Sequence, residues 1–238
     1  MKRGTGQNYM IRFLVITILI SLSCGFLTGC ATHQARSAHI SGFLEDYSQL
    51  KEGSGDEALL VYIKSGVDFK KYDKILLEPI KVYAQPQKSF WRDATDKETQ
   101  AMLDYFDASI RKSLEDEMKF VNKPGAGVLK IRIAITEANA SNVPRDVVSS
   151  ILPVGIALSA LKGVATGKES AVGSAGVEME VLDSQTGERL GAFVDERIGY
   201  KYTGRFDKFS QWRAAKAAFD YWALRMNIRL AELRHSDK

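Results

Sequence analysis

The chain has 238 residues, of which 33 are Lys or Arg and 29 are Asp or Glu, with a formal net charge of +4 at pH 7. The first 29 positions hold three basic residues and no acidic one, so the remainder carries 30 basic against 29 acidic side chains. A nucleic-acid-binding domain needs a basic surface, and this balance argues against one. The remaining length fits one domain of ~100–200 residues that can bury a core.

The N-terminal segment has the pattern of a secretory signal that ends in a cysteine. A basic start precedes an apolar run over residues 13–26, and Leu27-Thr28-Gly29-Cys30 follows with small residues at the cleavage position. An ordinary secretory signal or an uncleaved anchor is the alternative, but the run is short for a membrane span of ~20 residues. We predict a lipoprotein signal peptide over residues 1–29, with a lipobox cleaved between Gly29 and Cys30 and palmitate-type acylation at Cys30.

Lipid on Cys30 implies attachment to a bacterial membrane, because two or more acyl chains hold a protein stably. Ala31 follows the cysteine, where an Asp retains lipoproteins at the inner membrane of many Gram-negative bacteria. We therefore expect an outer-membrane lipoprotein that faces the periplasm. The polar, small residues up to 41 predict a flexible tether. Cys24 leaves with the signal, so no disulfide or thiolate metal site is expected.

Residues 42–234 show the periodicities of a single α+β domain. Long amphipathic helices are predicted over residues 95–121, where Thr95 and Glu98 match a capping box, and over residues 207–234. Strands are predicted over residues 59–63, 75–83, 127–138, 172–182 and 190–199. The order of these elements predicts a two-layer sandwich, in which an antiparallel or mixed sheet of about five strands has both helices on one face. Pro79 predicts an edge or a bulge in its strand.

Two features of the predicted strands concern charge. Lys130 and Arg132 lie on the wet face of one strand, and Glu178 and Glu180 lie on the outer face of another. We expect these glutamates to be solvated partners in a cross-strand charge ladder rather than a catalytic pair. Before the first strand, apolar residues at helical spacing in residues 41–50 predict a strap that lies against the core.

A further segment, residues 144–167, fits neither periodicity and is rich in apolar and small residues. Small side chains recur every fourth position, at Gly155, Ser159, Gly163 and Gly167. Such a stripe lets helices or a membrane approach the backbone closely. One interpretation is a long connection with a buried helical turn, and the other is a site of self-association or membrane contact, since long internal loops are usually functional.

Groups that carry chemistry are scarce in the sequence. His33 and His39 lie in the tether and His235 in the C-terminal tail, so neither a Ser-His-Asp triad nor a histidine metal site is expected. Asp195 and Glu196 are adjacent in a strand and point to opposite faces. Basic residues near the C-terminus, Arg225 among them, match a helix-end preference for cations better than a binding patch. We predict no catalytic residues, no metal and no cofactor.

The string SGFLEDYSQLKEG at residues 41–53, YIKSGVD at residues 62–68 and EMEVLD at residues 178–183 resemble an uncharacterised bacterial lipoprotein family, domain-of-unknown-function family 3313. The resemblance covers roughly residues 30–230 and implies a cell-envelope lipoprotein of unknown activity. It implies no catalytic residues.

Two functions remain open from the sequence. The first is a non-enzymatic envelope lipoprotein that binds a protein partner or its own copies at the membrane surface. The alternative is a periplasmic small-ligand-binding protein or a hydrolase that uses only carboxylates and tyrosine. A concave pocket that gathers such side chains would favour the alternative.

Overall fold

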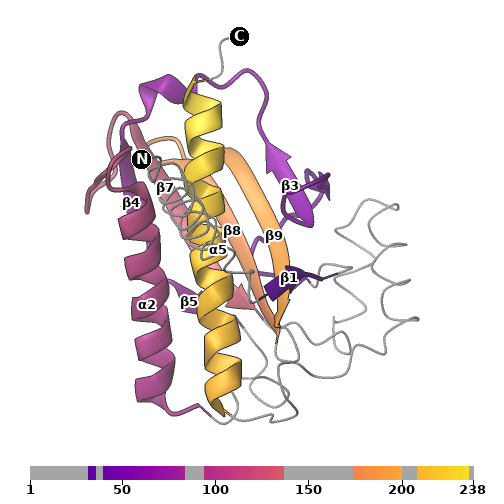
Figure 1. Ribbon diagram of the computed structural model, residues 1–238. Helices are drawn as coiled ribbons and strands as arrows, with labels where there is room; N and C mark the ends of the chain where they lie inside the picture. Colours follow the sequence, from indigo (N-terminus) through magenta and orange to yellow (C-terminus); the bar gives the residue numbers. More distant parts are fainter. Residues whose placement is uncertain (1–31, 36–39, 84–93, 137–173, 200–207, 236–238) are drawn as a thin grey trace, which may run out of the picture. The chain divides into compact units, whose positions relative to one another are not determined.

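A computed structural model describes residues 32–35, 40–83, 94–136, 174–199 and 208–235. Its main layer is one mixed sheet, and helices α2 (Asp96–Leu114) and α5 (Lys208–His235) lie side by side on one face of it (Figure 1). This arrangement confirms the predicted α+β class and the placement of both helices on one face. Within the described residues the sheet has nine strands rather than about five, because one predicted strand is split and three short strands are added.

The centre of the sheet is an antiparallel set formed by β7 (Val128–Thr136), β8 (Ser174–Asp183) and β9 (Arg189–Gly199). The predicted hairpin between β8 and β9 is confirmed. Its turn places Gly187 at a φ of +73°, a conformation that L side chains rarely adopt. Because successive residues alternate between faces, Val177 and Met179 point towards the helices while Glu178 and Glu180 point away.

The outer strands extend this sheet on both sides, in the order β2-β3-β9-β8-β7-β4-β6. On one side, β3 (Leu60–Ile63) pairs antiparallel with β9, and β2 (Lys51–Glu52) pairs with β3. On the other side, β4 (Lys74–Leu77), β5 (Lys81–Val82) and β6 (Lys119–Phe120) form parallel pairs. The predicted strand over residues 75–83 is split at Pro79, which has no N–H to donate to the ladder.

Helix α2 begins as the sequence predicts and ends earlier. The Thr95 side chain accepts from the backbone N–H of Glu98 while the Glu98 side chain accepts from that of Thr95, so the capping box is confirmed. The helix ends at Leu114 rather than at Val121. The next three residues are acidic, which the negative end of a helix disfavours. Lys119–Phe120 then joins the sheet beside β4, so the prediction of a continuous helix to Val121 was wrong.

The main core lies between the helices and the sheet. Phe106 of α2 and Phe219 of α5 are fully buried and stack with ring centroids 4.5 Å apart. Ile131 and Ile133 of β7 belong to the same cluster, and so do Phe219, Ala223 and Leu230 of the predicted α5 stripe. The other described members of that stripe, Met226 and Leu233, are partly buried and pack against the cluster. The amphipathic assignment of α5 is therefore confirmed over its described side chains.

The opposite face of the sheet is also covered, which the sequence interpretation did not expect. Residues 40–50, called the strap below, form a chain of turns and bury Phe43, Leu44, Tyr47 and Leu50. They form a second apolar cluster with Ala134, Ala192 and Val194 of the central strands. The predicted strap is thus confirmed, and the predicted wet face of β7 was wrong where the strap covers it.

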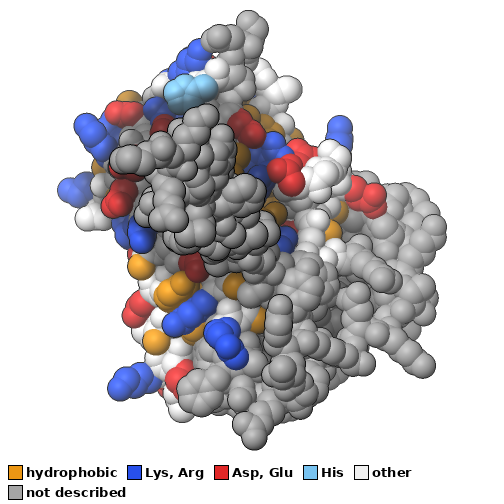
Figure 2. All heavy atoms as spheres, in the orientation of Figure 1, with side chains coloured by type: hydrophobic (Ala, Val, Ile, Leu, Met, Phe, Trp, Pro, Cys, Tyr) orange, Lys and Arg blue, Asp and Glu red, His pale blue; other side chains and the backbone are white. Residues whose placement is uncertain are grey.

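The predicted flexible tether needs a similar correction. Thr32–Gln34 forms β1, which pairs antiparallel with β9 at Arg197–Gly199. This part of the tether is therefore held on the sheet. Over the described surface of the face in Figure 2, Lys and Arg side chains are interspersed with Asp and Glu, as expected from the nearly balanced charge.

Several predicted features lie outside the described residues. They are the signal segment with Gly29 and Cys30, and the 144–167 segment with Gly155, Ser159, Gly163 and Gly167. Among the helices of the described ranges, none has the length and hydropathy that a membrane crossing requires.

Candidate functional site

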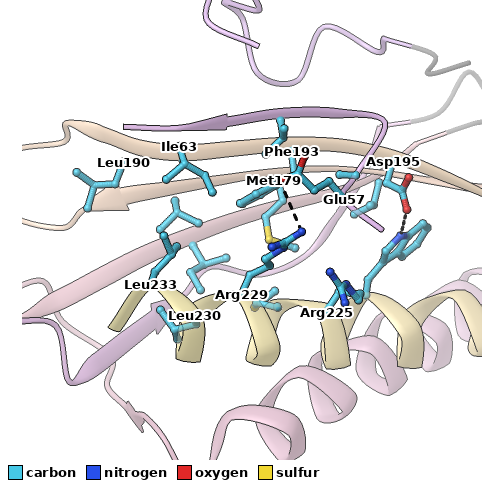
Figure 3. A pocket seen from close by; sticks show the side chains of 18 of the residues that line it. Glu57, Ile63, Met179, Leu190, Phe193, Asp195, Arg225, Arg229, Leu230 and Leu233 are labelled. Carbon is cyan, nitrogen blue, oxygen red and sulfur yellow. Dashed lines mark hydrogen bonds and ion pairs between the residues drawn. The ribbon is translucent and has the colours of Figure 1, made fainter. Parts of the chain in front are cut away.

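A groove with a cavity of about 110 Å³ lies between the C-terminal half of α5 and the helix-facing side of the sheet. Figure 3 shows Leu230 and Leu233 on α5 facing Ile63, Leu190 and Phe193 across it. The sequence builds this site by two periodicities. Alternation along the strands directs every second side chain to the helix side, and a spacing of three and four residues along α5 keeps its apolar side chains on the sheet side. The two helices do not cover the whole helix-facing side of the sheet. The part of the sheet that stays uncovered beside α5 forms one wall of the groove.

One end of the groove is closed by a buried carboxylate, Asp195 of β9, which is 4% exposed. Trp222 Nε1 donates to Asp195 Oδ2 at 2.7 Å, and Gln34 Nε2 donates to Oδ1 at 2.9 Å. The backbone N–H of Leu59 also donates to Oδ1, at 3.3 Å. Both carboxylate oxygens are therefore used in joining β9 to β1, to α5 and to Leu59, the residue before β3, and we assign Asp195 a structural role at the groove end.

Two arginines stand beside this carboxylate and point from α5 towards the strands (Figure 3). Arg225 Nη1 lies 2.7 Å from Asp56 Oδ2, and Arg229 Nη2 lies 3.3 Å from Asp56 Oδ1 and 3.6 Å from Glu57 Oε1. The predicted helix-end preference does not account for these contacts, which join α5 to the loop before β3. Arg225 Nη2 is buried and has no hydrogen-bond partner among the described residues.

The carboxylate Glu178 lies on the other face, beneath the strap. It is fully buried, and it accepts from Tyr47 Oη at 2.6 Å and from the backbone N–H of Ser41 at 2.6 Å. Tyr47 Oη in turn accepts from the backbone N–H groups of Gly42 and Leu44. Burial raises the pKa of the Glu178 carboxyl, and the pKa of Tyr47 is raised by burial and by this carboxylate. The expectation of a solvated Glu178 was wrong.

Glu180, two residues further along β8, is also buried but is paired with cations. Arg132 Nη1 lies 2.6 Å from Glu180 Oε2, and Arg189 Nη2 lies 2.6 Å from Oε1. Arg189 also donates to the backbone oxygens of Leu44 and Asp46 in the strap. Glu178 and Glu180 therefore hold the strap on the sheet. Neither glutamate lines the groove.

One cross-strand ion pair of the predicted charge ladder is present, between Arg132 and Glu180. The strands β7 and β8 are neighbours, as the ladder requires, and Arg132 lies opposite Glu180. Lys130 instead pairs with Glu78, at 3.4 Å. Glu178 lies opposite Ala134, so the predicted pairing of Glu178 with a basic side chain of β7 was wrong.

No group of three His, Cys, Asp or Glu side chains within the described ranges could hold a metal ion. His235 ends α5 with its side chain 73% exposed, and His39 lies outside the described residues. Sequence reasoning missed the roles of Gln34, Trp222 and Arg225. The available signal was the spacing of Trp222, three residues after Phe219 and four before Met226, which places it on the buried stripe of α5.

Over the described residues, fold and site together define an α+β domain with a mixed sheet, two helices on one face, a strap on the other and an apolar groove beside α5. The chain belongs to the family described as "Protein of unknown function (DUF3313)", whose model matches residues 39–226. The predicted resemblance is thereby confirmed.

Individual proteins that are similar to this chain were also found. The chain is similar to the uncharacterized lipoprotein YdcL of Escherichia coli (strain K12), with 27% identity over 171 residues, which are 70% of this chain and 75% of that protein. Among solved structures, it is similar to the PelC dodecamer from Paraburkholderia phytofirmans, with 13% identity and a TM-score of 0.36 over 69% of this chain and 96% of that one.

Proposed function

We propose that this protein is a cell-envelope lipoprotein that acts by binding, through the groove between α5 and the sheet, and not by catalysis. The groove is the observation that carries this proposal. It is a concave apolar site with a few convergent polar groups at one end, which is the usual form of a ligand site. The carboxylates nearest to it are held by hydrogen bonds or ion pairs to neighbouring elements, so they act as parts of the frame.

The anchor belongs to the same proposal. Cleavage between Gly29 and Cys30 and lipid on Cys30 would hold the domain at the outer membrane, facing the periplasm. The family match and the likeness to a lipoprotein support a membrane-anchored role. The small-residue stripe of Gly155, Ser159, Gly163 and Gly167 stays a proposed contact with the membrane, an envelope protein partner or a second copy.

Of the two alternatives to a protein-binding role, the groove favours small-ligand binding over hydrolysis. A carboxylate-dependent hydrolase needs carboxylates that reach a substrate. Glu178 is covered by the strap, and Asp195 accepts three hydrogen bonds from its own chain.

Photo-crosslinking tests the groove. The full chain in a detergent-free amphipol is labelled with a diazirine-bearing dodecane, and the modified peptides are mapped by mass spectrometry. We expect labels on α5 and β9 beside the groove. Gly191→Leu should abolish them, because Gly191 lines the groove and a Cβ there has ordinary contacts of 3.4 Å or more. Gly125→Leu, outside the groove, is the control. Equal labelling of the two variants would contradict binding in the groove.

The anchor is tested separately, in cells supplied with a labelled fatty acid. Wild-type protein should incorporate the label and fractionate with the outer membrane, whereas Cys30→Ser should do neither. Equal incorporation by the two proteins would remove Cys30 as the site of lipid attachment.

A further inference from the structure

The polar end of the groove contains one donor, Arg225 Nη2, for which the described part of the chain supplies no acceptor. Arg225 Nη1 binds Asp56, whereas Nη2 is buried without an acceptor among the described residues. A buried guanidinium N–H without an acceptor is unusual in a folded protein, because the lost hydration is not replaced. A ligand that brings an oxygen acceptor to this position would satisfy it.

The charge around this donor argues against an anion. Two guanidinium groups, Arg225 and Arg229, share this end with three carboxylates, Asp56, Glu57 and Asp195. A further negative group would meet an excess of negative charge. A neutral acceptor such as a carbonyl oxygen complements a site whose cations are already paired.

The rest of the groove is hydrocarbon. Val177, Met179 and Phe193 line it from the sheet, and Met226, Leu230 and Leu233 line it from α5. A peptide would bring an N–H and a C=O at every residue, and these side chains offer them no partners. The cavity of about 110 Å³ corresponds to roughly eight waters when each needs ~10–15 Å³. A single extended hydrocarbon chain matches the apolar chemistry of this lining.

We propose that the groove binds one neutral acyl ester, with its hydrocarbon chain along α5 and its carbonyl oxygen accepting from Arg225 Nη2. This inference rests on the proposed binding role of the groove and names the class of ligand. The carbonyl is the only polar atom that must be buried, and the alcohol part of the ester lies towards Asp56, whose side chain is 69% exposed.

The test compares two ligands that differ in the carbonyl alone. 1-Monododecanoylglycerol is an ester, and 1-O-dodecylglycerol is the ether with the same chain and head. Each competes with the diazirine-bearing dodecane for the full chain in amphipol, and the concentration that halves labelling of the groove is measured. Wild type should prefer the ester about tenfold, the value of one hydrogen bond to a charged donor. Dodecanoate, an anion, should compete less well than the ester.

Two variants test whether Arg225 is the source of the preference for the ester over the ether. Arg225→Met keeps an apolar side chain of similar length but no donor, and it should retain labelling by the hydrocarbon probe while losing the ester preference. Arg213→Met, on the exposed surface of α5, should behave as wild type. The proposal is overturned if wild type does not distinguish ester from ether, if dodecanoate competes better than the ester, or if the preference survives Arg225→Met. Absence of hydrocarbon labelling in the groove would instead refute the proposed binding role itself.

Discussion

The Tyr47 hydroxyl donates to Glu178 Oε2 at 2.6 Å, and both side chains are fully buried although they are 131 positions apart in the chain. The same hydroxyl oxygen accepts from the backbone N–H groups of Gly42 and Leu44. One phenol thus fixes the turns of the strap and attaches them to the central strand β8. This contact explains why the sheet keeps a carboxylate on a face that the strap covers.

Tyr47→Phe should therefore destabilise the fold more than loss of one exposed hydroxyl would. It removes a donor from Glu178 and an acceptor from two backbone N–H groups, and a buried polar group left unsatisfied costs ~1–3 kcal/mol. We expect a loss of that order in the free energy of unfolding, measured by urea denaturation. Tyr83→Phe is the control, because Tyr83 is 48% exposed. If both variants unfold at the wild-type midpoint, the Tyr47–Glu178 contact does not hold the strap.

Glu178 should make stability depend on pH. Burial raises the pKa of its carboxyl above the ordinary 4.5, and hydrogen bonds from Tyr47 and Ser41 oppose this only in part. The Glu178 carboxyl then keeps its proton to a higher pH in the folded state than in the unfolded state. The stabilisation that this raised pKa gives to the folded state is thus fully present below pH 4.5, and it is lost as the pH rises through the folded pKa of Glu178.

Glu178→Gln removes this titration and is the direct test. We expect wild type to lose stability relative to Glu178→Gln as the pH is raised from 4.5, measured by urea denaturation across the range. Glu45→Gln, on the exposed side of the strap, should follow wild type at every pH. A constant difference between wild type and Glu178→Gln would mean that Glu178 does not titrate with a raised pKa.

Glu180 should be more costly to remove than an exposed glutamate of the same hairpin. Its side chain is 5% exposed and pairs with Arg132 and Arg189, so Glu180→Ala removes the buried carboxylate from two partly buried cations and leaves Arg132 with a longer contact to Glu78 at 3.8 Å. Breaking a buried pair in this way costs about 3–5 kcal/mol. Glu188→Ala, which breaks an exposed pair with Lys64, should cost at most ~1 kcal/mol.

Two double-mutant cycles test which side chains of the predicted charge ladder interact. Arg132→Met and Glu180→Met should show a coupling energy in the unfolding free energy, because the two groups are in contact. Lys130→Met and Glu178→Met should be additive, since Lys130 pairs with Glu78 instead. Additivity in both cycles would show that Arg132 does not stabilise Glu180.

Phe219→Ala should test the packing of the two helices. Phe219 is fully buried and stacks on Phe106 at 4.5 Å, so its truncation leaves a cavity in the main core. We expect a loss of ~3–5 kcal/mol in the free energy of unfolding. Leu224→Ala is the control on the same helix, with Leu224 53% exposed and an expected change within ~0.5 kcal/mol. Similar losses in both variants would mean that the face of α5 is misassigned.

Local features of the fold were predictable from the sequence because their causes are local. Thr95 and Glu98 are three residues apart and satisfy each other's backbone, so the start of α2 follows from the pair alone. Gly187 supplies the positive φ of a turn between two alternating strands. The alternation of Val177 to Glu180 shows that β8 has two faces of different character.

Only the tertiary structure decided what covers each face. Glu178 was expected in solvent because alternation identifies the second face but contains no information about the strap, which lies far away in sequence. Asp195 likewise obtains its donors from Gln34, Leu59 and Trp222, which belong to three separate segments. Periodicity reports the neighbours of a residue along the chain. Burial and hydrogen-bond partners, and therefore the groove and its unused donor at Arg225, depend on which distant segments pack together.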